Sequence, residues 1–286
     1  MTHLYHYCSS KTFFDIISKK EIWLSSLSLS NDSMEGKLVS RTFERIIKRE
    51  NIDHDVVRTI QLSIQRAEEL FDGLGFCLSA DGDLLSQWRS YANNGQGFSI
   101  GFSKEHLESL SNSQADNEPK LRLHDVLYEP SEHEEALRPI FEEIKTSLND
   151  GKLNKPTFGI LGKFLDENEK KTRQEEYDKQ VKELWLKAIN MLPNLYILKN
   201  KAFSEERESR LISHLNRGKD DDSLYRASEN KLIPYRIVRL KELGALAISK
   251  VFIGPKNITP KPVVEKFLKQ EGFDQVTVEI SSATYR

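Results

Sequence analysis

The stretch FCLSADGDLLSQWRSYANNGQGFSIGFS, residues Phe76–Ser103, decides the fold that the rest of the chain must fit. Its first four residues form an apolar run typical of a buried strand, and turn-forming residues follow, ending in Asp83, whose carboxylate can cap a helix. Apolar residues then recur at helical spacing from Leu84 to Ala92. Residues 93–97 tolerate positive φ, so we expect the chain to reverse there and to enter a second strand.

The second predicted strand, residues 98–102, has two unequal faces. Phe98, Ile100 and Phe102 would form one large apolar face, because alternate side chains of a strand point the same way. Ser99 and Gly101 leave the opposite face almost bare, which suits close approach by a helix, another backbone or a ligand.

The composition is that of an ordinary soluble globular protein. The chain has 286 residues, of which 30% are charged and 38% hydrophobic, and its formal net charge is -2. It can bury a sizeable core, and it lacks the broad basic surface of a duplex-binding protein. Cys8 and Cys77 lie far apart without metal-ligand spacing, no signal peptide is evident, and no apolar run could cross a bilayer. We expect a cytoplasmic protein with no membrane partner and no metal.

Both ends of the chain predict strands, and the middle predicts helices. Strand patterns occupy residues 4–8, 22–26, 122–128, 231–241, 246–253 and 276–280, and helical patterns occupy 38–71 and 131–198. Residues 107–119 are expected to be a polar loop. We predict a single α+β domain, residues 1–286, in which a curved mixed sheet is built from both ends of the chain and a helical insertion, about 131–198, packs beside it. The final strand, helix and strand indicate a parallel crossover.

Two distant stretches carry candidate chemistry. The opening strand contains His6, and the stretch Lys199–His214 contains Glu206, Glu208 and Arg210. An extended conformation would project these last three side chains from one face. Neighbouring charges are costly to bury unless they pair with one another or face a wet cleft, so a cleft and a charged edge strand both stay open.

Several short motifs follow one another along the chain: LYHYCS, IWLSS, NDSMEG, LLSQWRSYANNGQGFSIGF, FSEERESRLI, VFIGPKN and SSATYR. Their order resembles that of the bacterial family known as domain of unknown function 2971, and the resemblance spans nearly the whole chain. Because that family has no assigned activity, the resemblance alone implies no function.

A second resemblance concerns layout only. A strand with a histidine, a helix, a strand with serines and a late strand with a Glu-x-Glu pair are similar to the ADP-ribosyltransferase superfamily. The resemblance implies that His6 holds the ribose of NAD and that Ser25 or Ser26 is the polar residue of the second core strand. It also implies that Glu208 is the catalytic glutamate and that Glu206 orients the acceptor.

The same resemblance implies an aromatic side chain against nicotinamide. Cationic side chains that face the same groove would steady the pyrophosphate by charge-assisted hydrogen bonds. The aromatic candidates are Tyr5, Tyr7 and Trp23, of which Tyr7 stands where the superfamily often has glycine. The cationic candidates are Arg210, Arg89 and Lys256.

The leading hypothesis is therefore an enzyme that transfers ADP-ribose from NAD to a protein or nucleic-acid acceptor, or that hydrolyses NAD. A carboxylate near the ribose would stabilise the oxocarbenium-like transition state. By analogy of layout, a role in phage defence or as a toxin is expected. One alternative is a non-enzymatic nucleotide- or protein-binding module that uses the bare face at Ser99 and Gly101 and the helix that carries Trp88 and Arg89. The other is a metal-dependent hydrolase with the carboxylates of Asp32, Glu35, Glu206 and Glu208 as ligands.

Overall fold

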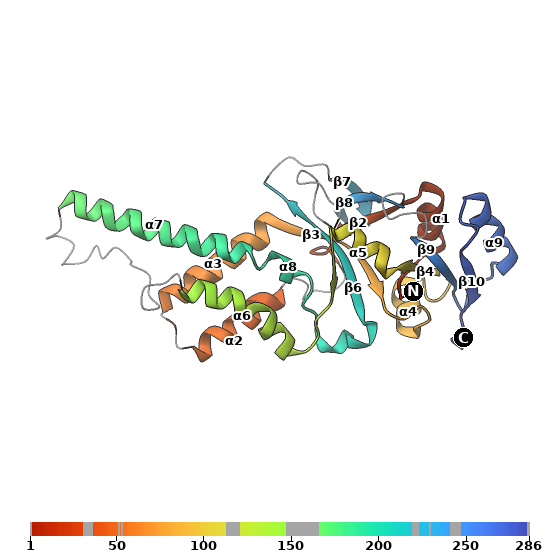
Figure 1. The fold of residues 1–286 in the computed structure, drawn as a ribbon, viewed down its shortest axis with the longest axis horizontal. Coiled ribbons are helices and arrows are strands. Elements are labelled where there is room, and N and C mark those ends of the chain that lie inside the picture. Colours follow the sequence, from red (N-terminus) through yellow and green to blue (C-terminus); the bar gives the residue numbers. More distant parts are fainter. Residues whose placement is uncertain are drawn as a thin grey trace.

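A computed structural model describes residues 2–30, 37–50, 52, 54–112, 121–146, 166–218, 223–228, 230–240 and 247–284. Within these residues the protein is α+β, as predicted (Figure 1). The strands are β1 (His3–Cys8), β2 (Glu21–Ser26), β3 (Phe71–Ser79), β4 (Phe98–Ser103), β5 (Arg122–Asp125), β6 (Glu208–Asn216), β7 (Leu224–Ser228), β8 (Lys231–Arg239), β9 (Ile248–Ile253) and β10 (Thr277–Ile280). The helices are α1 (Ser10–Lys19), α2 (Lys37–Arg49), α3 (His54–Leu70), α4 (Leu85–Tyr91), α5 (Lys104–Asn112), α6 (Pro130–Thr146), α7 (Glu167–Ile189), α8 (Leu192–Leu195), α9 (Lys261–Gln270) and the 3-10 helix η2 (Lys201–Glu206).

The strands form one open sheet in the order β10-β9-β4-β1-β3-β2-β8-β7, with β6 and β5 branching from β3. Paired strands within the described residues are antiparallel except β9 and β10, which are parallel and are joined by α9. The sheet is therefore mixed and built from both ends of the chain, as predicted. The final strand–helix–strand order correctly indicated the parallel pair.

Strand β3 is the branch point of this sheet. One of its edges pairs with β6 along its whole length, from Phe71 to Ser79. Its other edge is divided, because Leu74 and Gly75 pair with β2 while Ser79 pairs with Tyr5 of β1. Residues 76–78 therefore lie between two strands that diverge. We call this opening the fork.

The turn and strand after α4 have the predicted geometry. Asn93, Asn94 and Gly95 have φ values of 49°, 57° and 84°, so the chain reverses where positive φ was expected. The next strand, β4, directs its apolar face (Phe98, Ile100 and Phe102) into the main core, where residues of α1 and α9 pack against it.

The face of β4 that we expected to be bare is covered by aromatic side chains. Ser99 is fully buried and pairs with Tyr7 on one side and Phe252 on the other. A Cβ atom at Gly101 would lie only 2.9 Å from the ring of Tyr5. This face is therefore closed by the protein itself and offers no binding surface at Ser99 and Gly101.

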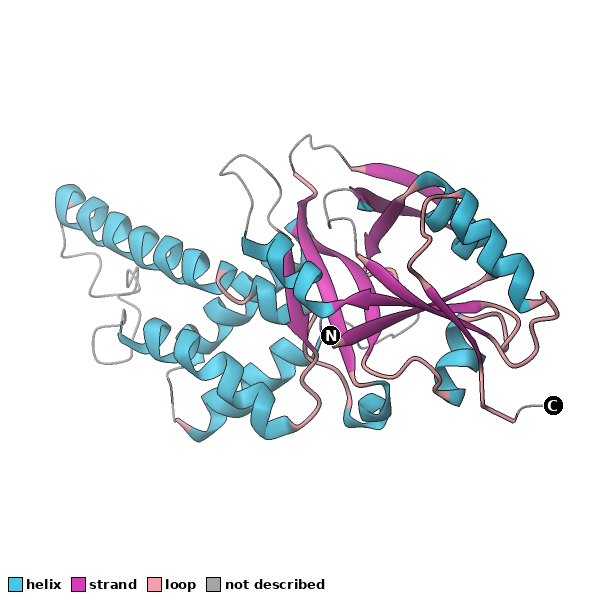
Figure 2. Cartoon of the chain, turned by 45° about the vertical axis from the view of Figure 1, so that its right-hand side comes forward, coloured by secondary structure: helices cyan, strands magenta, loops and turns pink. Residues whose placement is uncertain are grey.

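A second core forms where helices pack beside β3 and β6 (Figure 2). Helices α2, α3, α6, α7 and α8 supply its buried side chains. The last three of these helices run from Pro130 to Leu195, close to the predicted insertion at about 131–198, although residues 147–165 lie outside the described chain. The prediction of a loop over residues 107–119 is wrong in its first part, because α5 runs to Asn112. Among the described helices, none combines the length and apolar content needed to span a membrane.

The prediction that Asp83 caps α4 is wrong, because Leu84 occupies that position. Asp83 instead accepts hydrogen bonds from Trp88 Nε1 at 2.7 Å, from the Ser281 hydroxyl, and from the backbone N–H and hydroxyl of Ser282, both at 2.7 Å. These bonds attach the C-terminal segment to α4. We call this arrangement the Asp83 clasp.

We expect Asp83→Asn to lower the free energy of unfolding by about 1–3 kcal/mol, because it weakens several charge-assisted hydrogen bonds. Burial raises the pKa of a carboxyl, but at Asp83 the bonds from the two serines and the indole outweigh this and lower its pKa. A lowered pKa stabilises the fold above the ordinary aspartate pKa, and the contribution disappears as the pH falls below it. Urea unfolding at pH 7 and pH 3, with exposed Asp274→Asn as the control, measures the difference. Equal losses in the two variants at pH 7 would contradict the clasp.

Candidate functional site

A cavity of about 340 Å³ opens at the fork. This volume lies within the range usual for small-molecule sites. A second cavity, of about 420 Å³, adjoins the first on the side of α1. The residues that line both cavities are His6, Ser25, Gly75, Cys77, Tyr91 and Arg226. The fork therefore lies between two adjoining pockets.

His6 occupies the fork. Its Nδ1 donates a hydrogen bond to the backbone carbonyl of Cys77 at 2.9 Å, at a position where β3 has no strand partner on that edge. The ring also stacks on Phe76, with the ring centroids 4.1 Å apart. Burial lowers the pKa of His6 to about 4, so the imidazole is neutral at pH 7 and its Nε2 is an acceptor.

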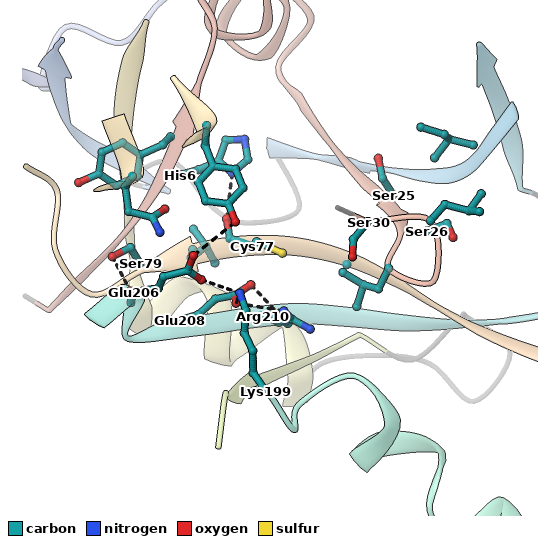
Figure 3. A pocket seen from close by; sticks show the side chains of 18 of the residues that line it. His6, Ser25, Ser26, Ser30, Cys77, Ser79, Lys199, Glu206, Glu208 and Arg210 are labelled. Carbon is teal, nitrogen blue, oxygen red and sulfur yellow. Dashed lines mark hydrogen bonds and ion pairs between the residues drawn. The ribbon is translucent and has the colours of Figure 1, made fainter. Parts of the chain in front are cut away.

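The acidic pair reaches the same cavity from the other end of the chain. Glu208 begins β6, but Glu206 ends η2, and Arg207 between them has a φ of 41°. The extended conformation predicted for this segment is therefore wrong at Glu206. The turn still brings both carboxylates to Lys199, whose Nζ lies 2.5 Å from Glu206 Oε2 and 2.8 Å from Glu208 Oε2 (Figure 3).

Glu208 is the centre of a buried ionic network. Arg210 donates to its Oε1 from Nε at 2.7 Å and to its Oε2 from Nη2 at 3.0 Å, so both oxygens are engaged. Burial alone would raise the pKa of Glu208, but the charge and hydrogen bonds of Arg210, together with Lys199, lower it to about 2. Burial likewise opposes the charge of Lys199, yet the two carboxylates raise its pKa.

Glu206 is engaged more loosely. Its Oε2 pairs with Lys199, whereas the contact to its Oε1 comes from the hydroxyl of Tyr91, at 3.4 Å. Tyr91 borders both cavities, and 45% of its surface is exposed. Burial, with the charge of Glu206, raises the pKa of Tyr91, so this hydroxyl stays protonated. Of the two carboxylates, Glu206 is therefore the one with an oxygen, Oε1, whose described contact is long.

The remaining predicted residues divide between cavity and core. Ser25 faces the cavity, where Arg226 Nη2 lies 3.5 Å from its hydroxyl. Ser26 borders the cavity but donates its hydroxyl hydrogen bond to buried Asp72 at 2.6 Å. Tyr7 also belongs to the core, because its hydroxyl bonds to two backbone groups of the turn before α4. Ser26 and Tyr7 are therefore supporting residues.

The structure does not bring the other predicted cations to the fork. Arg89 is exposed on α4, Lys256 lies in the turn after β9, and neither lines either cavity. Trp23 lines the second cavity and stacks on Tyr235, with centroids 4.4 Å apart.

The metal-hydrolase alternative depends on four carboxylates. Asp32 and Glu35 lie outside the described residues. Glu206 and Glu208 are paired with Lys199, and Glu208 also with Arg210. No group of three or more histidine, cysteine, aspartate or glutamate side chains in the described chain is arranged to hold a metal ion.

Sequence reasoning missed Lys199, Tyr91, Arg226 and Lys231 as residues of the cavity. Lys199 directly follows the apolar run 195–198 and comes shortly before the Glu-x-Glu pair. A cation in this position could have been predicted as the counter-ion of the two carboxylates. Tyr91 fits the helical apolar spacing of α4, so the sequence pattern did not distinguish it from a core residue. Arg226 and Lys231 belong to a hairpin, β7–β8, whose first strand spans only five residues and was not recognised as a strand.

We expect Glu208→Gln to lower the free energy of unfolding by about 3–5 kcal/mol, because Arg210 and Lys199 would keep buried charges without this partner. Glu206→Gln should cost less, because Lys199 still pairs with Glu208. The pKa of Glu208 falls from 4.5 to about 2 in the folded protein, so its contribution is present above pH 4.5 and is lost between these values. Guanidinium unfolding at pH 7 measures both variants. Equal or greater destabilisation by Glu206→Gln would contradict the network.

Comparison with known proteins gives one positive result. No curated protein and no solved structure matches the chain significantly. A family model described as "Protein of unknown function (DUF2971)" matches residues 87–211, the segment from α4 into β6. This segment contains Tyr91, Lys199 and the Glu206–Arg210 network. The predicted resemblance to the DUF2971 family is thus confirmed over residues 87–211, the segment that its model matches.

Proposed function

We propose that the cavities at the fork bind a nicotinamide dinucleotide and that the protein cleaves its bond between nicotinamide and ribose. The observation that carries this proposal is the convergence of His6, from the first strand, with Glu206 and Glu208, from the other end of the chain, on one cavity. The adjoining second cavity suits a ligand that has two halves.

Glu206 is the carboxylate that we assign to the reaction. Cleavage develops positive charge on the ribose, which a nearby carboxylate oxygen stabilises. The C1′–N bond breaks, its electron pair leaves with nicotinamide, and an oxygen of water or of an acceptor bonds to C1′ and loses its proton. Both oxygens of Glu208 are already bound to Arg210 and Lys199, so Glu208 would instead hold the network in place.

His6 and Tyr91 complete the proposed ribose and nicotinamide site. A neutral His6 offers Nε2 as an acceptor for a ribose hydroxyl, because Nδ1 is occupied by the Cys77 carbonyl. The exposed ring of Tyr91 provides an aromatic surface for nicotinamide. The acceptor of ADP-ribose would be water, protein or nucleic acid.

The test is nicotinamide release from labelled NAD, with and without protein and nucleic-acid acceptors. We expect Glu206→Gln to reduce the rate at least about 100-fold, because it removes stabilisation made in the transition state. Glu205→Gln is the matched control, since Glu205 is an exposed neighbour on the same helix. Circular dichroism verifies that each variant is folded. Equal rates for wild type and Glu206→Gln would contradict the proposed enzyme activity. No nicotinamide release by the wild type under any of these conditions would contradict it as well.

A nucleotide-binding protein without turnover is the second candidate. One observation favours it: the Glu206 carboxylate is paired with Lys199 at 2.5 Å, and a neutralised carboxylate stabilises positive charge poorly. This candidate predicts that NAD binds wild type and Glu206→Gln alike and is recovered intact.

A further inference from the structure

We infer that Arg226 and Lys231, on the β7–β8 hairpin, form an anion subsite that holds the pyrophosphate of the ligand. The identity of that ligand rests on the proposed function. Binding of phosphate oxygens by this subsite, in the cavity at the fork, can be measured without any turnover of NAD.

The hairpin directs both cations to the same cavity. Ser228 pairs with Lys231, and Arg226 pairs with Ile233, so these four side chains lie on one face of two antiparallel strands. All four line the cavity. Tyr225, next to Arg226, points the other way and is 65% exposed. The alternation along the strands therefore sets which side chains face the ligand.

The two cations contact neutral groups. Arg226 Nη2 lies 3.5 Å from the Ser25 hydroxyl, and Lys231 Nζ donates to the Leu29 carbonyl at 2.7 Å. In the described chain, neither forms an ion pair with a carboxylate. Lys199 and Arg210, at the acidic network, differ because each is bound to Glu208.

The cavity is therefore divided by charge. Figure 3 shows Ser25 and Ser30 on one side of Cys77, with Glu206, Glu208 and Lys199 on the other. Arg226 and Lys231 contact the chain on the serine side, at Ser25 and Leu29. Positive charge that no described carboxylate neutralises thus lies beside hydroxyl groups, apart from the acidic pair.

This combination fits a phosphorylated ligand. The guanidinium of arginine and the hydroxyl of serine are frequent donors to phosphate oxygens, and lysine adds a compact positive charge. Arg226 has five N–H donors and Lys231 has three, more than their contacts in the described chain use. If Glu206 acts on a ribose, as proposed, a ligand that reaches both Glu206 and this subsite combines a sugar with a phosphate group. A nucleoside diphosphate or a dinucleotide has that arrangement.

Isothermal titration calorimetry with ADP-ribose, ADP, inorganic pyrophosphate and adenosine tests the subsite. We expect Arg226→Gln and Lys231→Gln each to weaken ADP-ribose and ADP about 10-fold or more, and the double variant about 100-fold, because each removes a charge-assisted hydrogen bond to phosphate. Adenosine binding, measured at high concentration, should not change. Arg239→Gln is the matched control, since Arg239 is exposed on β8 and does not line either cavity.

The outcomes separate this inference from the proposed reaction. Binding of ADP, ADP-ribose or pyrophosphate that the double variant abolishes supports the subsite, even if no nicotinamide is released from NAD. Undiminished binding in the double variant overturns it, as does a wild-type protein that binds none of the three phosphorylated probes. Thermal unfolding of each variant ensures that lost binding does not reflect a lost fold.

Discussion

The hydrogen bond from His6 Nδ1 to the carbonyl of Cys77 is the interaction on which the site depends. A buried backbone carbonyl without a partner is costly, and at the fork neither β1 nor β2 supplies a strand N–H to this part of β3. An imidazole from β1 supplies the donor instead. The two strands can therefore diverge, and the gap between them becomes a cavity rather than a continuous sheet.

The ionic network defines the other wall of that cavity and links the helical layer to the sheet. Lys199 follows the helical segment, Glu208 begins β6, and Arg210 also donates to the carbonyl of Tyr196 at 2.6 Å. Buried ion pairs of this kind often stabilise a protein no more than apolar residues of similar size would. We therefore connect the geometry of these ion pairs, rather than their contribution to stability alone, with function. One carboxylate is held rigidly, and its neighbour, Glu206, keeps an oxygen toward the cavity.

The sequence predicted what depends on neighbouring residues. The alternation in β4, the reversal at residues 93–97 and the parallel pair of β9 and β10 were all visible as local patterns. The fork was not, because it arises when β1 and β2 take different parts of one edge of β3, and no pattern within a strand encodes that division. The end of η2 at Glu206 was missed because a non-glycine residue, Arg207, adopts positive φ there. The sequence thus predicted His6 and the acidic pair as parts of the site, but it did not predict Arg226 and Lys231 on the cationic side.

The protonation state of the His6 imidazole can be measured, and the divergence of β1 and β2 at the fork depends on its Nδ1–H. Long-range nitrogen–proton NMR of the histidine rings, with His6 assigned by its loss in His6→Asn, reports which nitrogen is protonated and at what pH the ring becomes charged. We expect a neutral ring protonated at Nδ1 that gains its second proton only near pH 4, because burial lowers its pKa. A ring that titrates near the ordinary value of 6.5, or one protonated at Nε2 when neutral, would contradict this prediction.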